Sequence, residues 1–168
     1  MKTLFLALLV GLCYLPTLSA PPVFDDRSAV LENPAAGGLP EALGSLAQAP
    51  PHRGLTNLSF AVNRLLMGDS PAYLRLGSLL LHLGAAAAVW TLARRLGFSG
   101  GWAAAWFALH PLTVFGAGYL AQRAVVLEAL LGFLCLMLYW RARETGSGQA
   151  YAGALGAAAL AMGARRRP

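Results

Sequence analysis

The sequence predicts an all-α fold, a multi-span membrane helix bundle with one long outer loop. Hydrophobic residues make up 57% of the chain and charged residues only 12%, and the mean hydropathy is +0.57. A soluble domain carries about 25% charged residues, so this chain has too little polar surface to remain a globule in water. Its apolar residues also gather in nearly uncharged runs of about 20 residues, the length that spans a bilayer.

The net charge is +6, and eight of the thirteen basic residues lie at the ends of these apolar runs. Such an excess of Lys and Arg is typical of the cytoplasmic flanks of membrane helices. A nucleic-acid-binding face would instead show a basic stripe in polar surroundings. We therefore expect membrane lipid, and not nucleic acid, as a partner. The basic positions are Lys2, Arg94, Arg95, Arg141, Arg143 and Arg165 to Arg167.

Residues 1–20 are predicted to form the first transmembrane helix, with residues 4–20 free of charge. The small residues Ser19 and Ala20 would permit cleavage of a signal peptide. Leu18 and the prolines that follow at once disfavour cleavage, so we expect a retained helix that acts as a signal anchor.

Residues 21–72 form the polar part of the chain and are predicted as the outer loop. This segment holds five of the seven acidic residues and seven prolines, and proline at this density disfavours long helices. One amphipathic helix is expected from Leu55 to Met67, on the membrane surface or against the bundle, because apolar residues recur there at helical spacing. Thr56 or Asn57 would cap its start.

Residues 73–164 are predicted to hold the remaining membrane helices. The second, third and fourth spans are expected at 73–93, 102–121 and 124–140, and the third is broken at His110-Pro111. A weaker fifth segment, rich in Ala and Gly, covers 149–164 and precedes the basic tail 165–168.

The charges predict one orientation for the first four spans, with the 21–72 loop outside and Arg94, Arg95, Arg141 and Arg143 inside. The fifth segment would carry the basic tail outside, against this tendency. The high Ala, Gly and Arg content suggests a bacterial source, so we expect an inner-membrane protein whose 21–72 loop is periplasmic.

Asp25 and Asp26 are candidate site residues because they follow the first span directly. Two carboxylates at the outer face could act as a general base or bind a divalent cation through oxygen. Neighbouring side chains of an extended segment point to opposite sides, so at most one would face a substrate. Spacing alone favours a solvated turn.

Other polar residues in the apolar runs have structural interpretations beside functional ones. His82 is expected to pack helices together through a hydrogen bond rather than to bind a ligand. Glu128, the one acid within a span, is a functional candidate or a partner of Arg123. Cys13 and Cys135 lie in apolar runs and form no metal-ligand spacing, so no metal site is predicted from them.

Five short segments in register carry a family resemblance over about residues 20 to 145. They are Phe24-Asp25-Asp26 with Asn33-Pro34, Arg53 to Phe60 with Asn63, Leu79 to Leu83, Ala108 to Pro111, and Tyr119 to Arg123 with Val126-Leu127. In this order they resemble the N-terminal membrane region of the transmembrane and tetratricopeptide-repeat O-mannosyltransferases, a family of C-type glycosyltransferases.

The resemblance implies sugar transfer from a polyprenyl-phosphate donor to a hydroxyl of a protein acceptor, on the lumenal or periplasmic side. By the same resemblance, Asp25 would be the base that deprotonates the acceptor, with Asp26 beside it. Arg53, His110 and Arg123 would lie near the donor phosphate, since Arg pairs well with phosphate oxygens.

The chain departs from the family pattern in three ways. Gly54 stands where the family has a proline, and no glutamate follows the His-Pro pair at residues 114–116. The chain is also far shorter, so an N-terminal fragment is expected. These departures favour a second hypothesis, a non-catalytic membrane protein that acts through helix or loop interactions.

Overall fold

The computed structural model describes residues 2–47 and 53–164, and the all-α prediction is confirmed because every regular element in these ranges is helical. Eight of these elements are α-helices and three are short π- or 3-10-helical turns. The elements are α1 (Lys2–Leu18), η1 (Arg27–Leu31), η2 (Pro34–Ala36), α2 (Leu39–Ala47), α3 (Gly54–Met67), α4 (Pro71–Arg95), α5 (Gly100–Leu109), α6 (Pro111–Gly118), η3 (Leu120–Gln122), α7 (Arg123–Thr145) and α8 (Gly148–Ala164).

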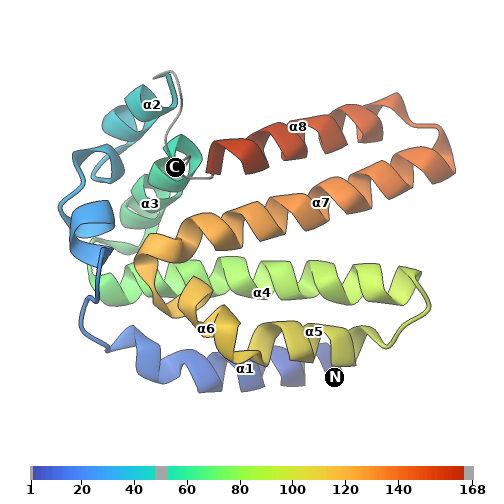
Figure 1. Ribbon diagram of the computed structural model, residues 1–168, viewed down its shortest axis with the longest axis horizontal. Helices are drawn as coiled ribbons and strands as arrows, with labels where there is room; N and C mark the ends of the chain where they lie inside the picture. Colours follow the sequence, from blue (N-terminus) through green and yellow to red (C-terminus); the bar gives the residue numbers. More distant parts are fainter. Residues whose placement is uncertain (1, 48–52, 165–168) are drawn as a thin grey trace.

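The long helices lie side by side and define two ends of the molecule (Figure 1). Helix α7 packs between α8 and α4, while α4 also packs on α5 and α1. We call the end at which α4 and α7 finish the basic end, because it carries Arg94, Arg95, Arg141 and Arg143. The opposite end, with residues 20–36 and 118–123, is the loop end. Helices α2 and α3 lie at the loop end (Figure 1).

Helices α4 and α7 are long and apolar enough to cross a membrane. Helix α4 begins at Pro71, after Ser70, whose hydroxyl accepts a hydrogen bond from the Tyr73 N–H. Its 25 residues extend over about 38 Å, more than the roughly 30 Å of a hydrocarbon core. The second such segment runs from Leu120 to Thr145. About two thirds of each apolar window lies outside the protein core, since 33% and 28% are buried.

The prediction of four spans is not confirmed. Helices α1 and α8 have 17 residues each, and residues 102–121 do not form one helix. They are divided into α5 and α6, of 10 and 8 residues. Pro111 has no N–H to continue α5, and the extended backbone of His110 turns the chain before α6 begins.

The core consists mainly of small residues, whereas large ones lie outside. Within the described ranges, alanine provides 16 of the 25 buried hydrophobic residues. Large apolar side chains are exposed along the helices, among them Leu12 at 65%, Trp102 at 80% and Trp106 at 76%. The backbones of the helices can therefore approach one another closely.

Helix α3 occupies the region of the expected amphipathic helix, but its apolar residues are divided, because Phe60 and Ala61 are buried while other apolar residues face outward. Leu65 and Leu66 are 69% and 74% exposed, whereas Asn63 is buried. The predicted caps are wrong, because Arg53 precedes the helix without a side-chain cap. Thr56 instead donates to the Ala164 carbonyl of α8 at 3.1 Å. Thus polar side chains, together with the buried Phe60, hold α3 against the bundle.

Candidate functional site

Four of the five predicted site residues come together at the loop end from three separate segments. Asp25 and Asp26 follow α1, Arg53 precedes α3, and Arg123 begins α7. The short turn η3, just before α7, lies among them. The fifth predicted residue, His110, lies elsewhere.

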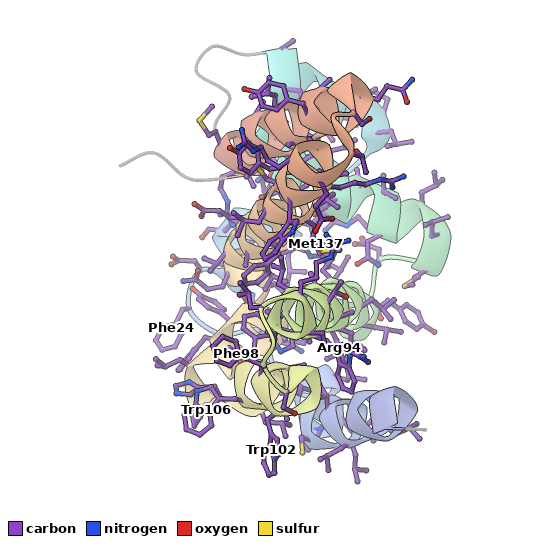
Figure 2. All side chains as sticks on the ribbon, turned by 90° about the vertical axis from the view of Figure 1, so that its right-hand side faces the viewer. Phe24, Arg94, Phe98, Trp102, Trp106 and Met137 are labelled. Atoms are coloured by element: carbon purple, nitrogen blue, oxygen red, sulfur yellow. The ribbon has the colours of Figure 1, made fainter. Side chains whose placement is uncertain are left out.

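A strained turn presents Asp25 to the exterior. Phe24 has a φ of +47°, the left-handed region that non-glycine residues rarely adopt. Its side chain is 87% exposed and points away from the bundle (Figure 2), with its ring edge-on to Tyr119 at 6.0 Å. The N–H of Asp25 donates to the Tyr119 hydroxyl at 3.2 Å. The Asp25 side chain is therefore exposed on a turn that is anchored at its backbone.

Asp26, by contrast, is fully buried and held by three groups. Its Oδ1 accepts from the Ala121 N–H at 3.1 Å, and its Oδ2 accepts from the Val23 N–H at 3.3 Å. The Arg75 Nη2 lies 3.7 Å from Oδ2. The two neighbouring carboxylates thus have different environments, as expected, although they lie in a turn rather than in an extended segment.

Arg75 completes the buried ion pair and was not among the predicted site residues. It lies in the first part of α4, is 1% exposed, and donates to the carbonyls of Gly118 at 3.1 Å and Pro21 at 2.9 Å, and to that of Ala20. It therefore ties the chain after α1 to α4 and α6. A charged residue within an apolar span is a functional or structural signal by itself, and that signal could have identified Arg75.

Arg123 is a buried cation surrounded by neutral acceptors. It is 1% exposed and donates to Ser78 Oγ at 2.9 Å, Asn63 Oδ1 at 2.8 Å, the Ser59 carbonyl at 3.2 Å, and the Leu74 carbonyl. Its guanidinium carbon lies 3.7 Å from the centre of the Phe60 ring, close enough for a cation–π contact. Among the described residues, no carboxylate forms an ion pair with it.

Arg53 holds the other side of the η3 turn. Its own backbone is left-handed, with a φ of +57°, and its Nη2 donates to the Ala121 carbonyl. Since Asp26 accepts from the N–H of the same residue, Ala121 is held from both sides. Arg53 is half-buried, and its Nε is buried within the protein.

His110 is not brought to this cluster. It ends α5 and caps α6, where its Nδ1 accepts from the Leu112 N–H at 3.3 Å. Its ring lies 5.8 Å from that of Trp106. The eight residues of α6, about 12 Å of helix, separate it from Tyr119.

The break before α6 also creates a polar contact inside the bundle. The Ala108 carbonyl accepts from the Tyr14 hydroxyl at 2.9 Å and from His82 Nε2 at 3.2 Å. The second bond confirms that His82 packs one helix against another.

A cavity of about 300 Å³ lies beside His82 among α4, α5, α6 and α7. Its wall is mostly apolar, with Gln122 at the loop end.

Asp25 and Asp26 do not fit a shared divalent cation. One side chain is exposed, and the oxygens of the other accept two backbone hydrogen bonds and lie against Arg75. Within residues 2–47 and 53–164, no three His, Cys, Asp or Glu side chains gather as cation ligands. The oxygens of Asp26 are therefore committed to internal contacts and do not join Asp25 in binding a cation.

The accessible groups at the loop end can support proton transfer and anion binding. Asp25 is exposed and its turn is fixed, so its carboxylate could accept a proton from a bound hydroxyl. Arg53 provides positive charge at the same end. Glu128 is half-buried on α7. A functional role for this carboxylate stays a prediction.

The chain was compared with protein families, curated proteins and solved structures, and none of the three comparisons gave a match.

Proposed function

We propose that this chain is a membrane protein of glycosyltransferase type, which transfers a sugar from a polyprenyl-phosphate donor to a protein hydroxyl. The observation that carries the proposal is that two adjacent carboxylates have different environments, one buried and one exposed. Asp26 anchors the loop internally, whereas Asp25 is held outward by a strained turn. Strained backbone of this kind is concentrated at functional sites. The family resemblance supplies the reaction class.

In the proposed reaction, Asp25 accepts the proton of the acceptor hydroxyl. The hydroxyl oxygen then attacks the anomeric carbon of the sugar, and the bond from that carbon to the donor phosphate breaks. Polyprenyl phosphate leaves with the electron pair of that bond. Positive charge from Arg53 and from the buried Arg123 would stabilise the departing phosphate. His110, at the far end of α6, has no part in this step.

We further propose that α4 and α7 cross a bilayer, with the loop end outside. The basic end then lies in the cytoplasm, as the arginines in the last turns of α4 and α7 favour. A core of alanine with large residues outside suits lipid, because lipid tails are as apolar as leucine and small residues let helices pack. The outward Leu65 and Leu66 of α3 would then lie in the membrane interface.

The test is sugar transfer from a polyprenyl-phosphate donor in membranes that contain this chain. Asp25→Asn is expected to lower transfer by about a hundredfold or more, the usual contribution of a general base. Glu32→Gln is the matched control, because Glu32 is another exposed carboxylate of the same segment, and it should keep its activity. Absence of transfer from folded wild-type protein, or equal losses in both variants, would contradict the proposal.

A second candidate function is that of a non-catalytic membrane scaffold. It is favoured by the internal use of Asp26, Arg75 and Arg123, whose polar atoms bond to the chain itself. If the folded wild-type protein transfers no sugar, this function becomes the better explanation of the loop end.

A further inference from the structure

We propose that an apolar groove at the basic end binds one anionic phospholipid, with the lipid phosphate on Arg94 and an acyl chain along α5. The groove lies among α1, α4 and α5 and has a volume of about 720 Å³. The proposal rests on the membrane placement above but not on sugar transfer. The lining includes Leu9, Trp90, Arg94, Phe98, Trp102 and Leu109.

The groove depends on a close approach between the end of α4 and the start of α5. A Cβ atom at Gly100 would lie 2.7 Å from the Arg94 Cγ and 2.7 Å from the Trp90 carbonyl oxygen. Only glycine permits this contact, which lays the Arg94 stem against α5. Figure 2, which looks onto the basic end, shows Arg94 near the end of α4 and Trp102 projecting outward from α5.

The length of the groove suits one leaflet of a bilayer. Helix α5 has ten residues, about 15 Å, and the groove follows it from Gly100 to Leu109. Half of a hydrocarbon core is also about 15 Å thick. Trp90, one turn before Arg94, and Trp102, in the first turn of α5, line the part of the groove toward the basic end. Tryptophan is enriched at the level of lipid headgroups. An acyl chain could therefore follow α5 while its headgroup stays beside Arg94.

Charge selects an anionic headgroup for this groove. Within the described part of the chain, the Arg94 guanidinium forms no hydrogen bond or ion pair, and no acidic residue lines the groove. Guanidinium groups bind phosphate oxygens with two parallel hydrogen bonds. An exposed arginine beside an apolar groove thus matches both parts of an anionic phospholipid.

A second groove at the same end has a different charge. It lies between α4 and α7 and includes both Arg143 and Glu144. Glu144 pairs with Arg95 at 3.2 Å and accepts from the Trp140 Nε1 at 2.6 Å. The acid weakens the attraction for an anion there, so Arg143 is the matched control for Arg94.

Quenching of tryptophan fluorescence by brominated lipids tests the proposal in vesicles. The protein carries Trp106→Phe and Trp140→Phe, so that only Trp90 and Trp102 report. Phosphatidylcholine vesicles contain a small fraction of brominated phosphatidylglycerol or, in parallel, of brominated phosphatidylcholine. We expect the anionic lipid to quench more strongly at equal fractions. Arg94→Gln should lower this preference about fivefold, and Arg143→Gln should change it little.

Ala105→Phe provides an independent variant, because Ala105 lines the groove and a larger side chain there would fill it. We expect this variant to lose the preference while Arg94 is still present. Equal quenching by both lipids in the wild type, or equal losses in the Arg94 and Arg143 variants, would overturn the proposal. Failure of the chain to insert into vesicles would overturn it as well, whereas absence of sugar transfer would leave it standing.

Discussion

At the scale of single residues, arginine side chains at the loop end donate to backbone carbonyls near the ends of helices and turns. The last carbonyls of a helix have no partner within it, and buried carbonyls without partners are costly. A guanidinium carries five donors in a fixed fork, so one side chain can bond several carbonyls at once. The pairs are Arg53 with Ala121, Arg64 with Val30 and Ala36, and Arg75 with Ala20, Pro21 and Gly118. Arg123 differs, because its carbonyl acceptors Ser59 and Leu74 lie inside α3 and in the first turn of α4.

The ion pair of Asp26 and Arg75 should therefore be structural. Arg75→Met would leave a buried carboxylate without its cation, and such a loss costs about 3–5 kcal/mol. Adding Asp26→Asn should recover part of that loss because the uncompensated charge disappears. Denaturant unfolding in detergent micelles measures both effects. Arg27→Met, at an exposed position of the same segment, should stay within about 0.5 kcal/mol of wild type, and an equal loss there would contradict this role.

At the scale of elements, small residues and polar side chains decide how the helices meet. Gly77 of α4 lies against Asn63 of α3, and a Cβ atom there would be 1.8 Å from the Asn63 Oδ1. Asn63 cannot move freely, because it accepts from Arg123 at 2.8 Å and donates to the Tyr73 carbonyl at 3.2 Å. The close contact between α3 and α4 thus requires glycine at position 77, because a Cβ atom there would collide with Asn63.

Gly77→Ala should accordingly destabilise the protein by about 1–3 kcal/mol, as overpacking does. Gly132→Ala is the control, and it should stabilise the protein rather than destabilise it. A Cβ atom at Gly132 meets nothing within 4 Å, and alanine in a helix is favoured over glycine by up to about 1 kcal/mol. Chemical unfolding of the two variants in the same detergent gives the comparison. A stabilised Gly77→Ala protein would show that the close approach of α3 and α4 is absent.

The stability of the last turn of α8 should depend on the Thr56 hydroxyl of α3. Thr56→Val keeps the side-chain shape but removes the bond to the Ala164 carbonyl, at a cost of about 1 kcal/mol. Amide hydrogens in the last turn of α8 should then exchange faster. Thr91→Val is the control, because the exposed Thr91 hydroxyl bonds only within α4, to the Ala87 carbonyl. Unchanged exchange in α8 after Thr56→Val would refute this dependence.

At the scale of the whole molecule, apolar side chains cover the outside and alanine fills the inside. This arrangement is the reverse of a soluble bundle, whose larger apolar residues are buried away from water. Charge is divided as well. The basic end carries four arginines and one acid, Glu144, whereas on the loop side the five acids of residues 21–72 offset the charge of Arg27, Arg53, Arg64, Arg75 and Arg123. Composition and charge therefore favour the same axis through the bilayer.

This axis predicts which residues a membrane-impermeant maleimide can reach. In a background with Cys13 and Cys135 replaced by serine, Glu32→Cys should react in intact cells, because position 32 is exposed at the loop end. Arg141→Cys, exposed near the basic end, should react only after the membrane is permeabilised. Labelling of both positions in intact cells, or the reverse pattern, would reject the proposed orientation.

Much of the loop end could be anticipated from the sequence, but not its internal contacts. The family resemblance implies that Asp25, Asp26, Arg53, His110 and Arg123 lie in one site, and all of these except His110 lie at the loop end. The roles of individual side chains could not be anticipated, because Asp26 bonds to Ala121 across 95 residues of chain. Nor could the sequence show that His110 lies away from the cluster, since that depends on where α6 points.

The sequence by itself determined the helical class, the apolar runs, the polar segment and the positions of charge, because composition and periodicity are local properties. It also marked the break at His110-Pro111, since proline acts on its own backbone. Only the tertiary structure decided that this break divides a predicted span into two helices that are too short to cross alone. Tertiary structure also decided which of two adjacent aspartates is exposed and which side of α3 is buried. Burial depends on partners that are distant in sequence, and a local pattern carries no information about them.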